Sequence, residues 1–267
     1  MVYTPNEFED RVKIFLDSTK HYVFLSSSRV YADMGMDRIT EDSPRLLDVC
    51  KDPIYLDTNE YALAKAREEN MLFACKDSNW TIIRPYITYN DERLQLGTFE
   101  KELWLYRALN GKKIVFSEDM ADKYTTMTYG YDVAMVISEL IGNEKAYGEA
   151  FNIATEQYIK WDDVLDIYLK VIGEKTGYVP DKNMLLESNF IGDICGNKYQ
   201  ICYDRLFNRC FSNKKVNDVL GYDFQYTDVY KGLEKCLSRF IDNKTHMNIN
   251  WRREAYFDKI TGDKTEN

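Results

Sequence analysis

Two side chains four residues apart, Tyr61 and Lys65, have the types and the spacing for acid–base chemistry. Residues four apart share one face of a helix, so both would project from the same side. A lysine ammonium beside a phenol favours the phenolate, and a tyrosine tuned in this way can exchange a proton with an alcohol near neutral pH. The pair therefore suggests a tyrosine acid/base assisted by a lysine.

Two further stretches carry polar groups directly after apolar runs. Residues 26–28 are three serines that follow YVFL, and residues 84–86, RPY, follow TII. If these runs are parallel strands, their ends lie where open α/β sheets bind ligands.

Each signal has an ordinary alternative. The chain has 21 tyrosines, so the spacing of Tyr61 and Lys65 arises easily by chance, and serines after a strand commonly form a turn or a cap. The chemical interpretation rests on the conjunction of the three.

The elements that would position these groups follow from hydrophobic periodicity. Continuous apolar runs predict buried strands at YVFL, WTIIRP, KKIVF and EAFNIAT. Helical spacing of apolar residues predicts helices over residues 5–18, 58–77, 97–110, 131–142 and 162–173. Thr58 or Asn59 can cap the second of these helices. Strands that alternate with helices predict an α/β fold with a parallel sheet, followed after about residue 175 by helices and loops.

Composition and charge argue against several other kinds of site. The formal net charge of −9 disfavours non-specific binding to nucleic acid or to an anionic membrane. No apolar run reaches the ~18 residues of a membrane span. The six cysteines form no C-x-x-C pair and match neither a disulfide framework nor a zinc site. We therefore expect no metal, no nucleic-acid partner and no membrane. Because the N-terminus is unlike a signal peptide, we expect a cytoplasmic protein with reduced thiols.

Six motifs in a fixed order establish a resemblance to a known family. The stretches FLSSSRVYAD, ITEDSP, EYALAKAREENML, TIIRPYITY, DVAMVI and EAFNIAT resemble the extended short-chain dehydrogenase/reductase family, and within it the NAD-dependent epimerase/dehydratase group. The resemblance covers about residues 3–175, and later stretches look like that group's substrate-binding lobe. It implies that residues 1–155 are the C-terminal half of a Rossmann-like NAD-binding domain. Residues 156–267 would form a mainly helical substrate-binding lobe, interleaved with the first domain.

The resemblance also implies roles for individual residues. Tyr61 corresponds to the family's catalytic tyrosine, the acid/base toward a sugar hydroxyl, and Lys65 to the lysine that hydrogen-bonds the nicotinamide ribose. Ser27 matches the family's catalytic Ser/Thr by its distance from the Val-Tyr pair, and would orient the reacting oxygen. Ser26 and Tyr86, together with the catalytic three, are the implied cofactor contacts. The implied cofactor is NAD or NADP, and the implied substrate is a sugar or nucleotide sugar.

The sequence departs from this family at its start. The family begins with a strand and a G-x-x-G-x-x-G turn that holds the cofactor's pyrophosphate, whereas no glycine precedes Gly35 here. The first βαβαβ half of the sheet is therefore expected to be absent, on the order of 60–90 residues at ~30 per βαβ unit. Either the chain is a fragment of a longer protein or it is a naturally shortened relative. In both cases we expect it to bind NAD weakly or not at all by itself.

The substrate and the activity stay open at this stage. The resemblance leaves epimerase, dehydratase and reductase activities possible, and the stretch KYTTMTYGYDVA contains no arginine to grip a phosphate. One alternative is a non-catalytic, cofactor-free member of the family that binds a ligand or a partner. Another is RNA binding, which the net charge disfavours. Family members commonly form homodimers through the two helices that correspond to residues 5–18 and 58–77, so a homodimer is expected here.

Overall fold

The computed structural model describes residues 4–185, 187–243 and 246–264, and the chain forms two compact units. Unit 1 comprises Met1–Thr88, Thr126–Glu156 and Arg209–Tyr226, and unit 2 comprises Tyr89–Thr125, Gln157–Asn208 and Thr227–Asn267. The sequence analysis drew one boundary near residue 155 and expected some interleaving. In the structure the chain passes between the units several times.

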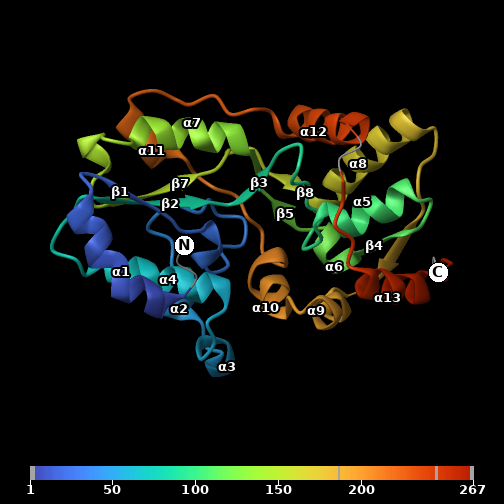
Figure 1. The fold of residues 1–267 in the computed structure, drawn as a ribbon, viewed down its shortest axis with the longest axis horizontal. Helices are drawn as coiled ribbons and strands as arrows, with labels where there is room; N and C mark the ends of the chain where they lie inside the picture. The colour runs from blue at the N-terminus through green and yellow to red at the C-terminus, as the bar shows by residue number, and fades with distance from the viewer. Residues whose placement is uncertain (1–3, 186, 244–245, 265–267) are drawn as a thin grey trace. The chain divides into compact units, whose positions relative to one another are not determined.

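Unit 1 is built on a parallel sheet of three strands in the order β1-β2-β7 (Figure 1). The strands are β1 (Tyr22–Leu25), β2 (Trp80–Pro85) and β7 (Glu149–Ile153). Leu25 is in register with Ile83, and Ile83 with Phe151. All three strands therefore end at the same edge of the sheet. This arrangement confirms the predicted α/β class with a Rossmann-like parallel sheet.

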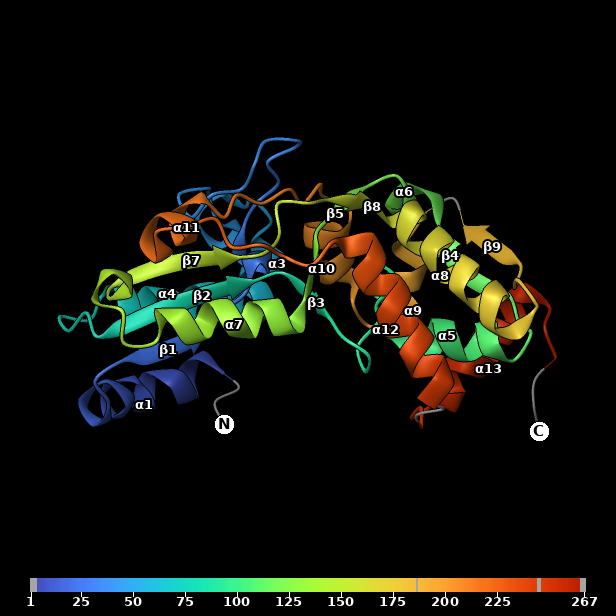
Figure 2. The ribbon, with the colours of Figure 1, turned by 90° about the horizontal axis from the view of Figure 1, so that it is seen from above.

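Helices cover both faces of this sheet (Figure 2). On one face, α1 (Pro5–Ser18) and α4 (Tyr61–Phe73) pack on Phe24 and Ile82. On the other face, α7 (Gly130–Leu140) and α11 (Lys214–Leu220) pack on alternate strand residues. That second core contains Ile83, Val133, Val136, Leu140, Phe151, Ile153 and Val216. Burial on both faces explains why the strands are continuous apolar runs.

The two helices of the first face begin at well-defined caps. In α1 the hydroxyl of Thr4 accepts from the Glu7 N–H at 3.3 Å, and the Glu7 carboxylate accepts from the Thr4 N–H at 3.2 Å. This reciprocal pair is a capping box. Helix α4 starts at Tyr61, later than predicted, and neither Thr58 nor Asn59 is its N-cap. Glu60 takes that place, and its carboxylate accepts from the Ala62 N–H at 2.8 Å.

Shorter elements complete unit 1. They are η1 (Ser28–Val30), α2 (Leu46–Val49), α3 (Pro53–Leu56), β3 (Ile87–Tyr89), β6 (Met127–Tyr129) and η2 (Glu144–Ala146). Strands β3 and β6 pair with each other.

Unit 2 is mainly helical and has two small sheets. Its helices are α5 (Lys101–Leu109), α6 (Glu118–Ala121), α8 (Trp161–Thr176), α9 (Asn189–Cys195), α10 (Lys198–Gln200), η3 (Ile201–Arg205), α12 (Val229–Asn243) and α13 (Trp251–Thr261). The strand predicted at KKIVF is β4 (Ile114–Ser117), which pairs in parallel with β9 (Lys182–Leu185), a strand the sequence analysis did not predict. β5 (Tyr124–Thr125) pairs antiparallel with β8 (Ile159–Lys160).

Residues 4–185, 187–243 and 246–264 contain neither a membrane-spanning helix nor a cluster of metal-binding side chains. None of the helices in these ranges has the length and apolar character that crossing a bilayer requires. The same residues contain no group of three or more His, Cys, Asp or Glu side chains placed to hold a metal ion.

Candidate functional site

The serine loop begins where β1 ends. The Ser26 N–H still donates to the Ile83 carbonyl at 2.8 Å, which extends the contact with β2 by one residue. The Ser26 hydroxyl donates to the Glu69 carboxylate at 2.6 Å, and the Ser28 hydroxyl donates to the Arg84 carbonyl at 2.7 Å. Both flanking hydroxyls thus hold the loop in place.

Ser27 is bonded differently from its neighbours. Its side-chain oxygen caps η1 by accepting from the Arg29 N–H at 3.2 Å. Among the described residues no acceptor is found for its own hydroxyl proton. Of the three serines, Ser27 is therefore the one whose hydroxyl proton is not already donated within the described residues.

Tyr61 is the first residue of α4, and its side chain is 47% exposed. The guanidinium of Arg29 lies over its ring, 5.3 Å from the ring centroid. Arg29 also pairs with Glu60 at 2.6 Å, and Glu60 in turn accepts from the hydroxyl of the fully buried Tyr55 at 3.2 Å. The phenol is thus accessible to a ligand while its ring is held by a chain of contacts that ends in the core.

Arg29 joins the two candidate catalytic groups, and sequence reasoning did not single it out. Its N–H reaches Ser27 and its guanidinium reaches the ring of Tyr61. The element that contains it, η1, packs directly against α4. The structure therefore brings Ser27 and Tyr61 together through a residue that immediately follows the serine run.

Lys65 lies one turn after Tyr61, and its ammonium donates to Glu68 at 2.9 Å. The same ammonium lies 4.7 Å from the centroid of the Phe24 ring. Lys65 lines a cavity of about 620 Å³ between α1, β1 and α4, together with Tyr22 and Phe24. Burial, with a smaller contribution from Glu68, raises the pKa of Tyr22 to about 12. Tyr22 therefore stays protonated at neutral pH and is a poor acid/base.

Tyr86 follows the last residue of β2 and is buried, with its ring 5.1 Å from that of Phe211. Its backbone is therefore fixed at the same edge of the sheet as the serine loop.

A buried ion pair lies behind the serine loop and was also not predicted. Arg84 donates to both carboxylate oxygens of Glu69 at 2.8 Å, and both side chains are almost inaccessible to solvent. Arg84 also donates to the hydroxyl of Tyr31 at 2.7 Å, which donates to Asn152 at 2.8 Å. Burial raises the pKa of Tyr31 well above its usual range. The network links β2, α4 and β7 directly beneath the loop. Glu69 lies two helical turns after Tyr61 on α4, and nothing in that spacing indicates its pairing with Arg84.

These groups can serve a ligand that carries a hydroxyl. A substrate oxygen that accepts from Ser27 would meet an exposed phenol able to exchange a proton with it. The ammonium of Lys65 supplies positive charge on the same helix. The arrangement suits proton transfer to or from an alcohol.

No protein-family model matches the sequence. Among curated proteins, the chain is 26% identical over 158 residues to the chloroplast stem-loop binding protein of 41 kDa b from Arabidopsis thaliana. That match covers 59% of this chain and 38% of the Arabidopsis protein, so the chain spans well under half of that relative.

Solved structures resemble the chain more extensively. The UDP-glucuronic acid 4-epimerase from Bacillus cereus, solved with NAD, has a TM-score of 0.62 and 16% identity, covering 92% of this chain and 67% of the epimerase. A UDP-N-acetylglucosamine 4-epimerase from Methanobrevibacter ruminantium gives 0.67 and 16%, covering 89% and 68%. The dTDP-glucose 4,6-dehydratase from Bacillus anthracis, solved with NAD, gives 0.62 and 17%, covering 90% and 66%. The fold is that of nucleotide-sugar epimerases and dehydratases.

Proposed function

We propose that the chain is an NAD(P)-dependent oxidoreductase or isomerase of the epimerase/dehydratase kind, acting on a sugar or nucleotide sugar. The observation that carries this proposal is the junction of Ser27 and Tyr61 through Arg29 at the carboxyl edge of a parallel sheet. The likeness of the fold to nucleotide-sugar epimerases and dehydratases supports it. The order of Ser27, Tyr61 and Lys65 along the chain supports it independently.

In this proposal each residue has one task. The hydroxyl of Ser27 donates to the reacting oxygen and orients it, and Tyr61 takes the proton from the sugar hydroxyl. NAD, when bound, would supply the hydride acceptor for the carbon that bears this hydroxyl. Lys65 would hold the ribose end of the cofactor in the cavity that it lines together with Glu68, once its ammonium leaves the Glu68 carboxylate.

The residues present fit the nicotinamide end of the cofactor. They do not supply the glycine-rich turn that would bind its pyrophosphate. Tyr61 is exposed and Lys65 lines a cavity, while Ser27 is buried but keeps a hydroxyl proton with no acceptor among the described residues. Ser26, an expected cofactor contact, already gives its hydroxyl to Glu69, so its contact would be through the backbone. Tyr86 would likewise contribute backbone. Because no glycine-rich turn is present in the sequence, we propose that NAD binds this chain weakly, and sub-micromolar affinity in a calorimetric titration would contradict this.

The activity is tested by incubating the chain with millimolar NAD and a panel of nucleotide sugars. UDP-glucose, UDP-glucuronic acid, UDP-N-acetylglucosamine and dTDP-glucose are followed by proton NMR. Slow conversion of at least one sugar, or formation of reduced cofactor, is expected. Replacement of Lys65 by Met should raise the KM for NAD. A chain that converts none of them would overturn the proposal.

The second candidate function is non-catalytic binding of a structured nucleic acid. The observation in its favour is the match to the Arabidopsis stem-loop binding protein, and the net charge of −9 disfavours it. Titration of a labelled RNA stem-loop at two salt concentrations tests it. Tight, salt-dependent binding without any sugar conversion would favour this candidate over the enzyme.

A further inference from the structure

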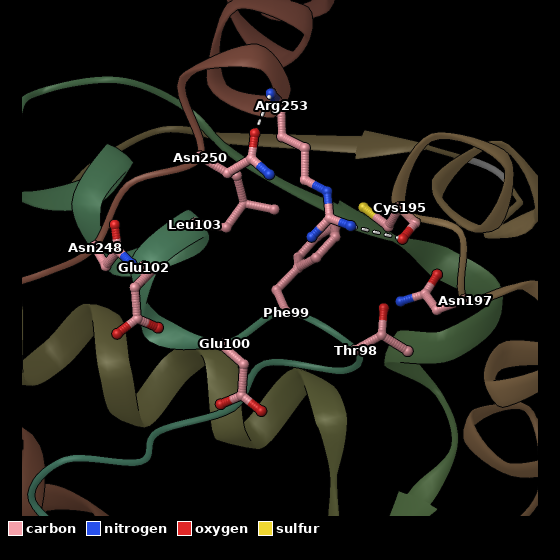
Figure 3. Close-up of a pocket in the computed structure, with 10 residues that line it drawn as sticks. All are labelled: Thr98, Phe99, Glu100, Glu102, Leu103, Cys195, Asn197, Asn248, Asn250 and Arg253. Atoms are coloured by element: carbon pink, nitrogen blue, oxygen red, sulfur yellow. Dashed lines mark hydrogen bonds between the residues drawn. The ribbon is translucent and has the colours of Figure 1, made fainter. Parts of the chain in front are cut away.

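A second cavity lies wholly within unit 2, and none of the predicted site residues lines it. Its volume is about 350 Å³, within the range of small-molecule sites. Three segments far apart in the sequence form its walls: residues 98–103, which lead into α5, residues 195–197, which follow α9, and residues 248–253, which lead into α13 (Figure 3). Phe99 and Leu103 supply the apolar part of the lining.

The wall contributed by α13 is firmly anchored. Behind it, Arg107 of α5 pairs with Glu254 at 2.8 Å and with Asp258 at 2.9 Å, and Lys112 pairs with the same two carboxylates. All four side chains are buried. Because Glu254 is fixed, its neighbour Arg253 leaves the helix at a fixed position. The wall of the cavity that α13 contributes is therefore held in place by buried ion pairs.

Arg253 crosses the cavity and ties two of its walls together. Its guanidinium donates to the Cys195 carbonyl at 2.8 Å, as Figure 3 shows. The side-chain oxygen of Asn250 caps the helix by accepting from the Arg253 N–H at 3.2 Å, which leaves the Asn250 amide group as a donor. A guanidinium has five N–H groups, so Arg253 can bind a ligand while it keeps its contact with Cys195.

Acceptors lie in the same walls. Thr98 Oγ1 and Asn197 Oδ1 are buried with no hydrogen-bond partner among the described residues. A buried acceptor without a donor costs free energy, so each such oxygen calls for a partner. They come from two different wall segments, beside α5 and after α9, and a ligand that donates hydrogen bonds would satisfy both.

Charge selects among ligand classes. Glu100 and Glu102 also line the cavity, so an anion would meet two carboxylates as well as Arg253. Each has a basic neighbour: Lys101 lies 2.6 Å from Glu102, and Arg93 lies 3.7 Å from Glu100. A cation would face Arg253. A neutral ligand whose groups both donate and accept fits this mixture best, and hydroxyl groups do both.

From these observations we infer that the cavity binds a neutral carbohydrate of one or two rings. Its hydroxyls would bond to Arg253, Asn197 and Thr98, and its apolar face would lie on Phe99 and Leu103. This inference goes beyond the proposed function, because it needs neither NAD nor Tyr61.

The test is ligand-observed NMR of the full chain, without NAD, against glucose, galactose, N-acetylglucosamine, maltose and lactose. At least one sugar should show saturable binding. Replacing Arg253 by Gln should weaken that binding by about tenfold, the effect of losing a charged hydrogen bond. Thr98→Val, which removes one hydroxyl at nearly constant volume, should weaken it by a smaller factor.

Two matched controls make the outcome decisive. Arg252→Gln changes an exposed neighbour on the same helix that does not line the cavity, and Tyr61→Phe disables only the proposed active site. Both should bind the sugar like the wild type. Absence of saturable binding for every sugar, equal binding by Arg253→Gln with its fold intact, or loss of binding in Tyr61→Phe would each overturn the inference. So would complete competition by millimolar inorganic phosphate, which would assign the cavity to anions.

Discussion

At the scale of single residues, Arg29 has the most specific expected role. It contacts Ser27 through its backbone and Tyr61 through its guanidinium. Arg29→Gln should leave both catalytic groups present but let the Tyr61 ring move, and small displacements of reacting groups can cost up to about a hundredfold in rate. We expect kcat to fall about tenfold or more while KM changes little. Arg29→Lys, which keeps the charge, should recover part of the loss.

Steady-state kinetics on the nucleotide sugar that the chain converts checks this. Lys13→Gln, at an exposed position on α1, is the control. A merely structural role for Arg29 would instead lower thermal stability with kcat unchanged per folded molecule, and that result would remove Arg29 from the site.

Sequence reasoning singled out Ser27, Tyr61 and Lys65 as candidates because their order matches a known arrangement of motifs. It could not find Arg29 or Glu69 as partners. The pair of Arg29 and Glu60 is 31 residues apart in the sequence, and that of Ser26 and Glu69 is 43 apart. Contacts across such separations leave no local periodicity, so only the folded chain reveals them.

At the scale of secondary-structure elements, His21 connects β1 to the end of α7. Its Nδ1 accepts from the Gly142 N–H at 2.9 Å, and its Nε2 lies 2.8 Å from the Thr81 hydroxyl. A proton on Nδ1 would oppose the Gly142 N–H, and burial lowers the pKa of His21. The unfolded chain therefore binds this proton more tightly than the folded chain does. The stability contributed by neutral His21 is complete above about pH 6.5, the pKa of an unperturbed histidine, and it is lost as the pH falls toward the lower pKa of the folded state.

Urea unfolding at about pH 7.5 and about pH 5.5 measures this effect. The wild type should lose more unfolding free energy on acidification than His21→Gln does. His246→Gln, the variant at the other histidine, should behave like the wild type. An identical loss in His21→Gln and in the wild type would refute the assignment.

The attachment of α13 to α5 depends on buried charges. Arg107→Met would leave Glu254 and Asp258 with Lys112 as their remaining cation, inside the protein. Removing one partner of a buried ion pair typically costs about 3–5 kcal/mol. We expect a loss of that order in the free energy of unfolding of unit 2, measured by denaturant titration. Arg252→Met, on the exposed side of α13, should change it by less than about 0.5 kcal/mol.

Element predictions succeeded where local signals were strong. The range 5–18 matches α1, and the apolar runs at β1, β2 and β7 became neighbouring parallel strands. The strand at KKIVF was placed correctly along the chain, but its partner is β9 in unit 2. Residues 182–185, KNML, alternate too weakly to predict a strand. Pairing partners are decided by tertiary packing, which hydrophobic periodicity does not report.

At the scale of the whole molecule, β1 is an edge strand of the sheet in the described residues, since it pairs with β2 alone. An unpaired edge promotes association with another chain, and the expected homodimer through α1 and α4 is an alternative route. An exposed apolar residue lies on each candidate dimer surface, so substitutions there can distinguish the two modes of association. Leu25 on β1 is 55% exposed, and Ile14 on α1 is 60% exposed. We expect a concentration-dependent dimer that Ile14→Lys weakens and Leu25→Lys leaves intact.

Sedimentation velocity over a hundredfold concentration range, about a micromolar upward, gives the answer. Weakening by Leu25→Lys alone would assign the association to the strand edge, against the family-derived expectation. A monomer throughout the range would contradict the homodimer itself.

The overall class of the molecule could be predicted because alternating elements and six ordered motifs agree. The division into units could not be fixed at one residue. Segments 126–156 and 209–226 belong to unit 1 because they contact residues far away in the sequence. Such long-range contacts cannot be predicted from local sequence patterns. The same limit hid the cavity in unit 2, whose walls come from three distant segments.

The proposed proton transfer by Tyr61 is tested most directly by one variant. Tyr61→Phe removes the phenolic oxygen and keeps the ring under Arg29, and loss of a general acid–base group costs about 10²–10⁴-fold. Turnover of a nucleotide sugar at saturating NAD should fall by at least about a hundredfold, with the affinity for the sugar little changed. Tyr178→Phe, at a tyrosine of unit 2 that is about as exposed as Tyr61, is the matched control and should keep its activity. Turnover by Tyr61→Phe equal to that of the wild type would contradict the proposed active site.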